Sequence, residues 1–445
     1  MKNDNIAAIS TALGAAGVAV IRISGDSPLA VAEKIFFPLE KISVCDFVPN
    51  KMYVGEIKTE KFSDFGMCVY FKAPKSFTGE DTVEIHSHGG VAIVKGILRE
   101  ILSNGARLAD NGEFTRRAFV NGKLSLSSAE GLIDMINAES LSGVKAGYSL
   151  YREKLNAKIC ALQDKVTEVL SSIDVDMDYP EENLDKLSEE TLINNLTEVN
   201  EEIEKLLSTF ATGRVLKNGV SVAICGKPNT GKSSILNALL NTEKAIVSDV
   251  AGTTRDVVEG SLDINGVRFN FYDTAGIRES GDKIETLGVE RSKKILESAD
   301  LVLFVMDCSE INEFDQEIYE LVQDKNVITV INKTDKCDNK DSRGDVYVSA
   351  LKGDNLDALK ELIYEKSVGN GVDYNGDFLS EERHYEALKR AKEKFEFALS
   401  MVKNAPLDIV AIDIKEGWDA LGEISGKTAT EEIINDIFAR FCVGK

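Results

Sequence analysis

The chain has 445 residues, of which 43% are hydrophobic, and its formal net charge is -22. This length exceeds what one hydrophobic core serves, so we expect about two or three globular domains. The acidic surface repels phosphate backbones at long range. This excludes strong binding of nucleic acid by the chain alone, because such binding requires a basic patch or a basic partner.

The cysteines give a prediction about redox state. The seven of them, at positions 45, 68, 160, 225, 308, 337 and 442, are scattered without a CxxC pair. The odd number and the spacing predict reduced thiols, not a disulfide framework or a zinc site. Because the chain has no apolar run of membrane-spanning length and no recognisable signal peptide, we expect a cytoplasmic protein without a membrane segment.

Residues 1–118 are predicted to form a mixed α/β domain. Strands are expected at 17–24 and 65–74, and helical spacing occupies 27–37 and 89–102. His86 and His88 lie two apart on one face of an expected strand, which is compatible with a metal or with hydrogen-bonded structural histidines. No third ligand is evident, which favours the structural interpretation.

Helical periodicity dominates residues 119–215, breaks at Tyr179-Pro180, and resumes in residues 373–445. Residues 216–372 between them have a different pattern of strands and helices. Insertions are tolerated where two chain ends lie close together, so we expect a helical domain interrupted by an inserted domain. The stripes of Leu, Ile and Phe on these helices predict core more than binding surface.

The inserted segment begins with a phosphate-binding pattern. Residues 220–225 form an apolar strand, the loop Gly226-x-x-x-x-Gly231-Lys232-Ser233 follows, and helical spacing continues in 235–240. Glycines allow consecutive N–H groups to face phosphates at a helix N-terminus. Lys232 would reach the β- and γ-phosphates, and the Ser233 hydroxyl would bind Mg²⁺.

Three further motifs follow in the order of a GTPase. Asp273 and Gly276 of "DTAG" suit a carboxylate in the Mg²⁺ shell and an amide that senses the γ-phosphate. The run Asn332-Lys333-Thr334-Asp335 offers a carboxylate to the N1–H and 2-amino groups of guanine, which adenine lacks. Together with Ser349 and Ala350, whose backbone could contact guanine O6, these motifs predict a Ras-like α/β P-loop domain that binds GTP.

The residue that orients the attacking water in Ras-like proteins, a glutamine after DTAG, is absent here. Ile277 stands in its place and cannot orient water. Glu285, a few residues further on, is a candidate, with Asp282 and Glu279 as alternatives. A solvated charged loop is also compatible with this spacing.

The transition state also needs a cation where Ras-like proteins borrow an arginine from a partner. Asn229 in the phosphate loop and the carbonyls of the small-residue loop 247–256 could surround a monovalent ion. Potassium could therefore take the place of the arginine.

Motifs along nearly the whole chain resemble one family, the tRNA modification GTPases called MnmE or TrmE. The motifs are "GKPNTGKSS", "AGTTRD", "DTAGIRE" and "NKTD", with "VAVIRISG" at 18–25, "SFTGEDTVEIHSHGG" at 76–90, "GEFTRRAFVNGKLSL" at 112–126, and the terminal "FCVGK". The GTPase motifs alone would also fit ribosome-assembly GTPases, whereas the N-terminal sequences and the terminus narrow the resemblance.

The resemblance implies roles for single residues. The phosphate loop contributes Asn229, Thr230, Gly231, Lys232, Ser233 and Ser234. Asn229, Ser248, Val250 and Thr253 resemble the family's potassium site, and Ser233 with Thr254 resembles its Mg²⁺ pair. Glu285 resembles the water-orienting glutamate.

The resemblance also implies that the N-terminal domain mediates dimerisation and binds a folate, 5-formyl- or 5,10-methylene-tetrahydrofolate. The matching positions are Arg22, Glu84, Lys123 and Lys445. A carboxylate can pair with the amino-pyrimidine edge of a pterin, and cations can meet its glutamate tail. Without the family, Arg22 and Glu84 fit ordinary surface residues equally well.

The terminal "FCVGK" follows a helical run, and a short fixed tail could bring Cys442 and Lys445 to the folate. Cys442 is then a nucleophile, or a buried small apolar residue. The family implies a homodimer that modifies the wobble uridine of tRNA at C5 with an FAD-dependent partner, in a heterotetramer. A ribosome-assembly GTPase and a regulatory switch protein are the alternatives.

Overall fold

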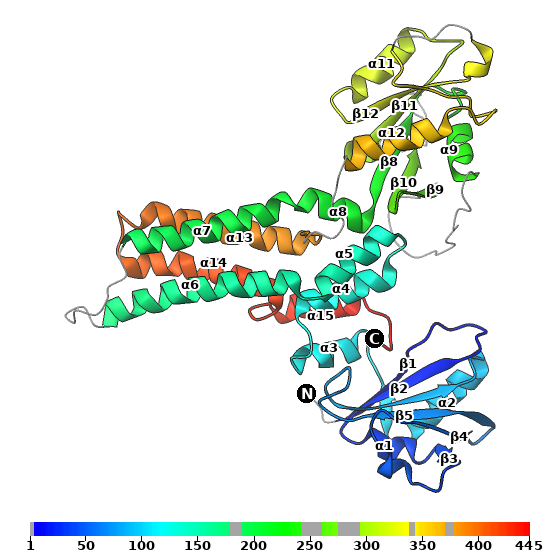
Figure 1. Ribbon diagram of the computed structural model, residues 1–445, viewed down its shortest axis with the longest axis vertical. Helices are drawn as coiled ribbons and strands as arrows, with labels where there is room; N and C mark the ends of the chain where they lie inside the picture. Colours follow the sequence, from blue (N-terminus) through cyan, green and yellow to red (C-terminus); the bar gives the residue numbers. More distant parts are fainter. Residues whose placement is uncertain (1–3, 179–188, 242–259, 275–293, 338–342, 370–377) are drawn as a thin grey trace, which may run out of the picture. The chain divides into compact units, whose positions relative to one another are not determined.

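The computed structural model describes residues 4–178, 189–241, 260–274, 294–337, 343–369 and 378–445. They form two compact units, and each combines a β-sheet with helices (Figure 1). Unit 1 comprises Met1–Ile133, Leu150–Glu201 and Glu386–Lys445, and unit 2 comprises Asp134–Ser149 and Glu202–Tyr385. No helix in the described ranges is both long and apolar enough to span a bilayer. The exact domain boundaries expected from the sequence stay a prediction.

A seven-stranded sheet forms the N-terminal part of unit 1, in the order β3-β4-β5-β6-β2-β1-β7. Its strands are β1 (Asn5–Ile9), β2 (Ala19–Gly25), β3 (Phe36–Pro38), β4 (Met52–Lys58), β5 (Ser63–Phe71), β6 (Asp81–Ser87) and β7 (Ala106–Leu108). All neighbours are antiparallel except β1 and β7. Helices α1 (Pro28–Ala32) and α2 (Val91–Ser103) pack on the sheet, and η1 (Val44–Asp46) is a short 3₁₀ turn. This confirms the expected mixed α/β domain.

The prediction of one helix in this domain is wrong for the second half of its range. The helical spacing of residues 27–37 predicts one helix, but α1 ends at Ala32 and Phe36–Pro38 form strand β3. Phe36 pairs with Ile57 of β4, and its ring is buried in the core. Pairing with a distant strand therefore overrides the local helical pattern.

The helices of unit 1 come from both sides of the inserted segment. They include α3 (Glu113–Val120), α4 (Leu126–Asn137), α6 (Lys154–Asp178), α7 (Glu189–Ser208), α13 (Glu382–Met401), α14 (Leu407–Ser425) and α15 (Glu431–Ala439), of which α4, α7 and α13 extend into unit 2. Helices α6 and α14 lie side by side, where Gln163 and Trp418 exchange hydrogen bonds through side chain and backbone (Figure 1). The helical pattern predicted on both sides of the insertion is confirmed.

A six-stranded sheet in the order β13-β12-β11-β8-β10-β9 forms the centre of unit 2. Its strands are β8 (Val220–Cys225), β9 (Gly260–Ile264), β10 (Val267–Asp273), β11 (Leu301–Asp307), β12 (Val327–Asn332) and β13 (Val346–Tyr347). The other elements are α5 (Leu141–Tyr151), which crosses into unit 1, α8 (Phe210–Asn218), α9 (Lys232–Asn241), α11 (Glu313–Val322), η2 (Thr334–Lys336) and α12 (Leu356–Val368).

Helices cover both faces of this sheet, as an open α/β fold requires. Val222 and Ile224 of β8 point into a core with α9 and α12, whereas Ala223 and Cys225 point into a core with α11. Neighbours are parallel except β9 and β10. The expected P-loop α/β class is confirmed.

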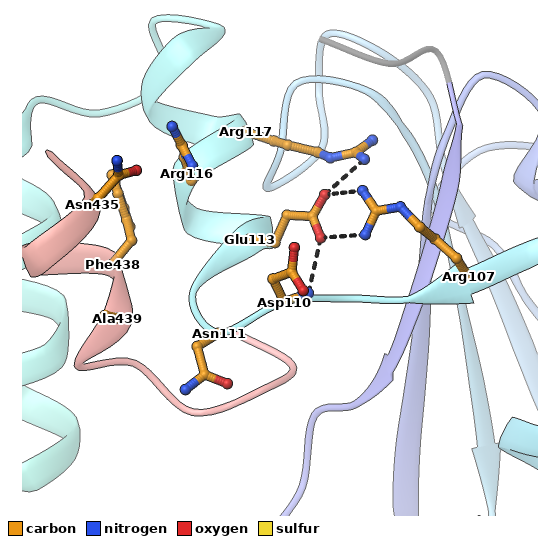
Figure 2. A pocket seen from close by; sticks show the side chains of 9 residues that line it. All are labelled: Arg107, Asp110, Asn111, Glu113, Arg116, Arg117, Asn435, Phe438 and Ala439. Atoms are coloured by element: carbon orange, nitrogen blue, oxygen red, sulfur yellow. Dashed lines mark hydrogen bonds and ion pairs between the residues drawn. The ribbon is translucent and has the colours of Figure 1, made fainter. Parts of the chain in front are cut away.

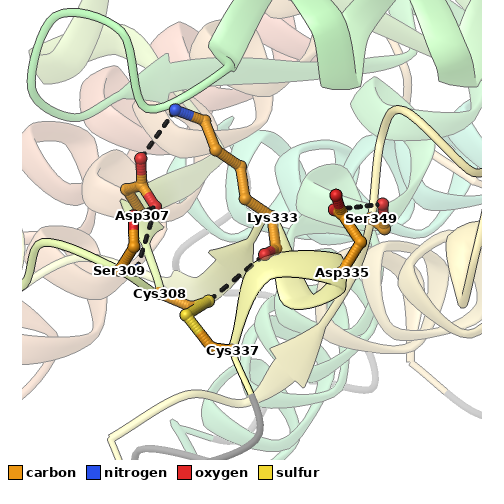
Figure 3. Close-up of a disulfide and its surroundings, with 7 residues drawn as sticks. All are labelled: Asp307, Cys308, Ser309, Lys333, Asp335, Cys337 and Ser349. Carbon is orange, nitrogen blue, oxygen red and sulfur yellow. Dashed lines mark hydrogen bonds and ion pairs between the residues drawn. A yellow bond between two sulfur atoms is a disulfide. The ribbon is translucent and has the colours of Figure 1, made fainter.

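The prediction that all seven cysteines are reduced thiols is wrong for two of them. Cys308 and Cys337 form a disulfide, with 6.3 Å between their Cα atoms, and the other five are free (Figure 3). The two residues are far apart in sequence but follow neighbouring parallel strands. Because the carboxyl ends of β11 and β12 meet at one edge of the sheet, the fold brings the sulfurs together.

Candidate functional site

The polar motifs of unit 2 meet at one edge of its sheet. Strands β8, β10, β11 and β12 are parallel, so the residues that end or follow them lie at the same edge. In open α/β sheets, ligands bind outside the carboxyl ends of the strands. We call this group of residues the nucleotide edge; its described members are Gly226–Ser234, Asp273, Asp307, Asn332–Asp335, Ser349 and Ala350.

The phosphate loop has a backbone that few residues other than glycine adopt. Gly226 and Gly231 have φ angles of 142° and 93°, and Asn229 has φ of 65°. A Cβ on Gly226 would lie 2.2 Å from the Val305 carbonyl oxygen, and one on Gly231 would lie 2.3 Å from Asn332 Nδ2. The loop is therefore packed against the ends of β11 and β12, and α9 starts directly after it at Lys232.

Two lysines hold this loop from opposite sides. Lys232 Nζ donates to the carbonyl oxygens of Gly226 and Lys227 at 3.0 and 2.9 Å, and its burial lowers its pKa. Lys227 Nζ pairs with Asp315 of α11 at 2.8 Å. Lys232 thus curls over the loop, where phosphate oxygens could replace the two carbonyls. The Lys227 tether was not predicted, because only the fold brings Asp315 near.

A hydroxyl and a carboxylate face each other beside the loop. Ser233 Oγ lies 3.4 Å from Asp273 Oδ2, while Asp273 Oδ1 is buried and has no hydrogen-bond partner among the described residues. Burial raises the pKa of Asp273, and Lys232 and Ser233 act against this shift. An unpaired buried carboxylate oxygen is costly unless a cation meets it, so this pair fits a hard divalent ion.

Asn332 and Lys333 connect the base-recognition motif to the phosphate loop. Asn332 Nδ2 donates to the Thr230 carbonyl at 2.9 Å, and Lys333 Nζ donates to the Asn229 carbonyl at 2.6 Å. Lys333 has φ of 62°, which turns the chain sharply at the end of β12. The structure therefore joins two motifs that lie about a hundred residues apart in sequence.

Asp335 and its neighbours form the far side of the edge. Ser349 Oγ donates to Asp335 Oδ1 at 2.7 Å and lowers the pKa of this carboxyl group. The Ala350 N–H donates to Asn332 Oδ1 at 3.1 Å. The carboxylate of Asp335 is thus oriented by the loop that also carries Ala350.

Asp307 is a site residue that the sequence analysis missed. Its carboxylate accepts from Lys333 Nζ at 2.6 Å and from the Ser309 hydroxyl at 2.7 Å. Burial would raise its pKa, but these partners hold it below the ordinary value. The available signal was an aspartate at the end of the apolar run 301–306, the same pattern that identified Asp273.

Several predicted site residues lie outside the described residues. They are Ser248, Val250, Thr253, Thr254, Gly276 and Glu285, together with the alternatives Glu279 and Asp282. Asn229, the described member of the predicted potassium site, is exposed at the tip of the phosphate loop.

A second group of predicted residues lies in unit 1, on adjacent strands. Arg22 of β2 and Glu84 of β6 are register partners, and Arg22 Nη2 lies 2.8 Å from Glu84 Oε1. Both side chains are 16% exposed. Burial would raise the pKa of Glu84, but His86 and Arg22 outweigh this and lower it. We call Arg22 and Glu84 the N-terminal pair.

The loop after β5 connects the N-terminal pair to Lys123. The guanidinium of Arg22 lies 5.2 Å from the centre of the Phe77 ring, and Lys123 Nζ donates to the Pro74 carbonyl at 2.9 Å. The fold therefore brings Arg22, Glu84 and Lys123 around one loop.

The two histidines near this loop have carboxylate partners. His88 Nδ1 lies 2.6 Å from Asp64 Oδ1, and His86 Nε2 lies 3.6 Å from Glu84 Oε2. No cluster of three metal-ligating side chains occurs in the described ranges. The His88 contact is a hydrogen bond, whereas His86 Nε2 is buried without a hydrogen-bond partner among the described residues, so the structural interpretation stays a prediction.

The C-terminal tail packs on β1 and on the turn before α3. Val443 forms a β-bridge with Asn111, and a Cβ on Gly444 would lie 2.2 Å from the Ile9 carbonyl oxygen. Ile9 pairs with Ile21, the neighbour of Arg22. Cys442 is exposed, so its interpretation as a buried apolar residue is wrong.

A cavity of about 510 Å³ in unit 1 lies between α3, α15 and the end of β7. Figure 2 shows that Glu113 faces Arg107 and Arg117 there, with the pairs at 2.5 and 3.0 Å. Asp4 also pairs with both arginines. Because these charges compensate one another, the cavity offers little attraction to a free anion.

Family comparisons agree with the resemblance. The MnmE helical domain family matches residues 126–442, and the family of the GTP-binding protein TrmE N-terminus matches residues 5–123. Among solved structures, the chain is similar to Aquifex aeolicus Era, with 36% identity over 39% of this chain and 66% of that chain. The TM-score of 0.29 is too low for this likeness to bear on the site.

Curated relatives match over the full length. A protein of Clostridioides difficile named tRNA modification GTPase MnmE is 39% identical over 459 residues, which cover 100% of this chain and 99% of that protein. A protein of Desulforamulus reducens with the same name is 40% identical over 464 residues, which cover 100% of both chains. The chain therefore belongs to the MnmE family of tRNA modification GTPases.

Proposed function

We propose that this chain hydrolyses GTP and uses the hydrolysis cycle to drive modification of the wobble uridine of certain tRNAs at C5. The added group is an aminomethyl or carboxymethylaminomethyl group. The observation that carries the proposal is the nucleotide edge, where a glycine loop, the unpaired oxygen of Asp273 and the oriented Asp335 converge. The name of the full-length relatives supports tRNA as the substrate.

The phosphates and the base of GTP would bind at opposite ends of this edge. Backbone N–H groups of residues 229–234 would surround the phosphates, and Lys232 would exchange its two carbonyl partners for β- and γ-phosphate oxygens. Asp335 would accept hydrogen bonds from the N1–H and 2-amino groups of guanine. Asn332 and Lys333 hydrogen-bond to the phosphate loop, so the residues that would bind the base and those that would bind the phosphates are directly connected.

The described pair Ser233 and Asp273 fits Mg²⁺, and Thr254 would complete the protein's contribution. Together these residues would hold a magnesium ion, which would supply positive charge against the charge that develops on the phosphates. Ser233 would supply a hydroxyl oxygen, and Asp273 would orient the shell through the oxygen that is unpaired.

Potassium would replace the arginine that other GTPases borrow. Asn229 offers an exposed amide oxygen at the loop tip, and Ser248, Val250 and Thr253 are the other proposed ligands. Glu285 would accept a hydrogen bond from the attacking water and so direct a lone pair of the water oxygen at the γ-phosphate. GTP turnover is expected to be at least about 10-fold faster in K⁺ than in Na⁺ at equal ionic strength, because a cation here contributes to the transition state. Equal rates would contradict the potassium site.

The N-terminal pair and Lys123 suit a tetrahydrofolate, in its 5-formyl or 5,10-methylene form, as the one-carbon donor. Glu84 is a partly exposed carboxylate with a lowered pKa, so it is ionised and able to accept from an amino-pyrimidine edge. Lys123 would meet the anionic tail of the ligand, while Arg22, 2.8 Å from Glu84, would contact the ligand at the same end as that carboxylate. Cys442 and Lys445 lie on a tail that packs beside the same sheet, and we propose that they complete the site.

The partners follow from the chemistry. One-carbon transfer to a uridine needs a redox step, and we propose an FAD-dependent partner that supplies it in a heterotetramer with a homodimer of this chain. A net charge of -22 leaves most of the attraction for tRNA to that partner. We propose a cytoplasmic location.

Reconstitution tests the whole proposal. The full chain, the flavoprotein partner, GTP, K⁺ and a reduced folate are incubated with unmodified tRNA, and nucleosides are analysed by mass spectrometry. A C5-modified uridine that depends on GTP and folate is the expected product. An unmodified uridine with intact GTP turnover would contradict the tRNA part alone.

A further inference from the structure

The disulfide lies directly beside the residues that would read guanine. Cys308 follows β11, and Cys337 follows the short turn η2, which contains Asp335 (Figure 3). Cys308 Sγ lies 3.2 Å from the Lys333 carbonyl oxygen, and the Cys308 N–H donates to the Asn332 carbonyl at 3.0 Å. The bond therefore ties the turn that carries Asp335 to the end of the neighbouring strand.

Three side-chain contacts position the base-recognition motif, residues 332–335. Ser349 holds the Asp335 carboxylate, Asp307 holds Lys333, and Thr230 holds Asn332. These contacts can each open and close, whereas a covalent bond between Cys308 and Cys337 cannot. The oxidised pair therefore restricts the motion of the turn relative to β11 more than the hydrogen bonds alone do.

The pair is accessible, in contrast to the buried cysteines of the chain. Cys308 and Cys337 are half-buried, whereas Cys68 and Cys225 are buried. Burial raises the pKa of Cys225 to about 12, so this thiol is inert at neutral pH. A small-molecule thiol or disulfide can thus reach the Cys308–Cys337 pair, as it can the exposed Cys45 and Cys442.

We propose that Cys308 and Cys337 form a thiol–disulfide switch that sets how tightly the chain holds a guanine nucleotide. The inference rests on the proposed role of Asp335 in binding guanine. In the oxidation step, one thiolate attacks a small-molecule disulfide and releases one thiol, and the second cysteine then displaces the other. The two cysteines lose two electrons and two protons in total, and the small-molecule disulfide is reduced to two thiols.

Oxidation tightens nucleotide binding in this scheme. The bond orders the Asp335 turn before the nucleotide arrives, so binding loses less conformational freedom. Linkage then works in both directions: a nucleotide that prefers the oxidised form also favours oxidation by the same factor. We expect this factor to be about 5-fold, the lower end of typical coupling between sites.

Dissociation of a fluorescent GDP analogue from the full chain tests the switch. The chain is either oxidised with a small-molecule disulfide or reduced with a dithiol, and the state of each cysteine is read by mass spectrometry. Release is expected to be about 5-fold slower from the oxidised chain. In Cys308→Ser and Cys337→Ser it should be insensitive to oxidation, whereas Cys45→Ser, which removes an exposed thiol outside the proposed sites, should respond as the wild type does.

Three results overturn the switch. Equal release from both forms would show that the bond leaves the base site unchanged, and failure of the pair to oxidise at any thiol-to-disulfide ratio would show that it is no switch. A supporting result is a rise in the oxidised-to-reduced ratio of the pair when GDP is added at a fixed thiol-to-disulfide ratio. Absence of GDP binding in both forms would overturn the proposed base site and the switch with it, which separates this failure from equal release.

Discussion

The nucleotide edge of unit 2 and the N-terminal pair of unit 1 each contain a carboxylate, and the two differ in pairing and in the direction of their pKa shift. Asp273 has one buried oxygen without a hydrogen-bond partner in the described part of the chain, and burial raises its pKa. Glu84 is paired with Arg22, and its pKa is lowered. The first carboxylate is therefore arranged for a cation from outside the chain. The second is already neutralised, so its ligand must bind both partners or replace one of them.

The largest effect on GTP turnover is expected at Asp273. Asp273→Asn removes the charge that the proposed Mg²⁺ requires, so kcat/KM for GTP should fall by about 10²–10³-fold, the range for removal of an electrostatic contact to the transition state. Magnesium titration of GTP hydrolysis measures the effect, because the variant should also need more Mg²⁺ for half-maximal turnover.

The control for that prediction is Asp357→Asn, which removes an exposed carboxylate from the first turn of α12. It should turn over GTP as the wild type does. Full activity of Asp273→Asn with an unchanged Mg²⁺ requirement would contradict the proposed role of Asp273 in the Mg²⁺ site.

A smaller effect is expected at the N-terminal pair, because folate binding must also offset the free energy of separating Glu84 from Arg22. Glu84→Gln should weaken binding of 5-formyl-tetrahydrofolate by about 10–100-fold, because a hydrogen bond to a charged group is lost. Isothermal titration calorimetry measures the affinity, and GTP turnover should not change.

The contrast between the two sites fails if a substitution in the N-terminal pair also changes GTP turnover. Glu84→Gln with reduced GTP turnover, or with unaltered folate binding, would mean that the N-terminal pair is structural. Glu56→Gln is a matched control, because Glu56 is a half-buried carboxylate of the same sheet, paired with Lys58.

A third carboxylate extends the comparison to stability. Asp134 and Glu381 share Lys217 in unit 2, with 2.9 Å between Lys217 Nζ and Asp134 Oδ1. Burial, with the charge of Glu381, raises the pKa of Asp134 to about 8, although Lys217 opposes this shift. The folded chain thus binds more protons than the unfolded chain between the ordinary aspartate pKa and about pH 8, and stability falls as pH rises through this window.

The smallest expected effect follows from that cluster. Asp134→Asn removes the titration, so it should flatten the fall in unfolding free energy between about pH 5 and about pH 8, a fall of roughly 1–3 kcal/mol in the wild type. Urea unfolding at several pH values measures the slope, with Asp357→Asn as the exposed control. An identical slope in wild type and Asp134→Asn would contradict a raised pKa.

The sequence was most informative where function restricts residue types at short range. The spacing of Gly226, Gly231, Lys232 and Ser233 predicted a strand, loop and helix, and β8 and α9 confirm them. The run 332–335 predicted a polar motif after a strand in the same way. These motifs are local because backbone N–H groups and a helix start must be adjacent in sequence to hold phosphates.

Long-range contacts could not be predicted in this way. The register of β2 and β6 pairs Arg22 with Glu84, and the edge joins Lys333 to Asp307 and Cys308 to Cys337. Each contact depends on which strands are neighbours, which no local pattern contains. The same reason explains why the helix expected over 27–37 is interrupted by β3.

Binding of GDP and of xanthosine diphosphate to the wild type and to Asp335→Asn tests the central claim most directly, that the nucleotide edge reads guanine through Asp335. The asparagine amide can donate to the O2 of xanthine but cannot accept from both guanine donors. The account predicts that Asp335→Asn loses GDP affinity by about 10²–10⁴-fold and prefers xanthosine diphosphate. Unchanged GDP affinity in this variant, with no gain for xanthosine diphosphate, would contradict it.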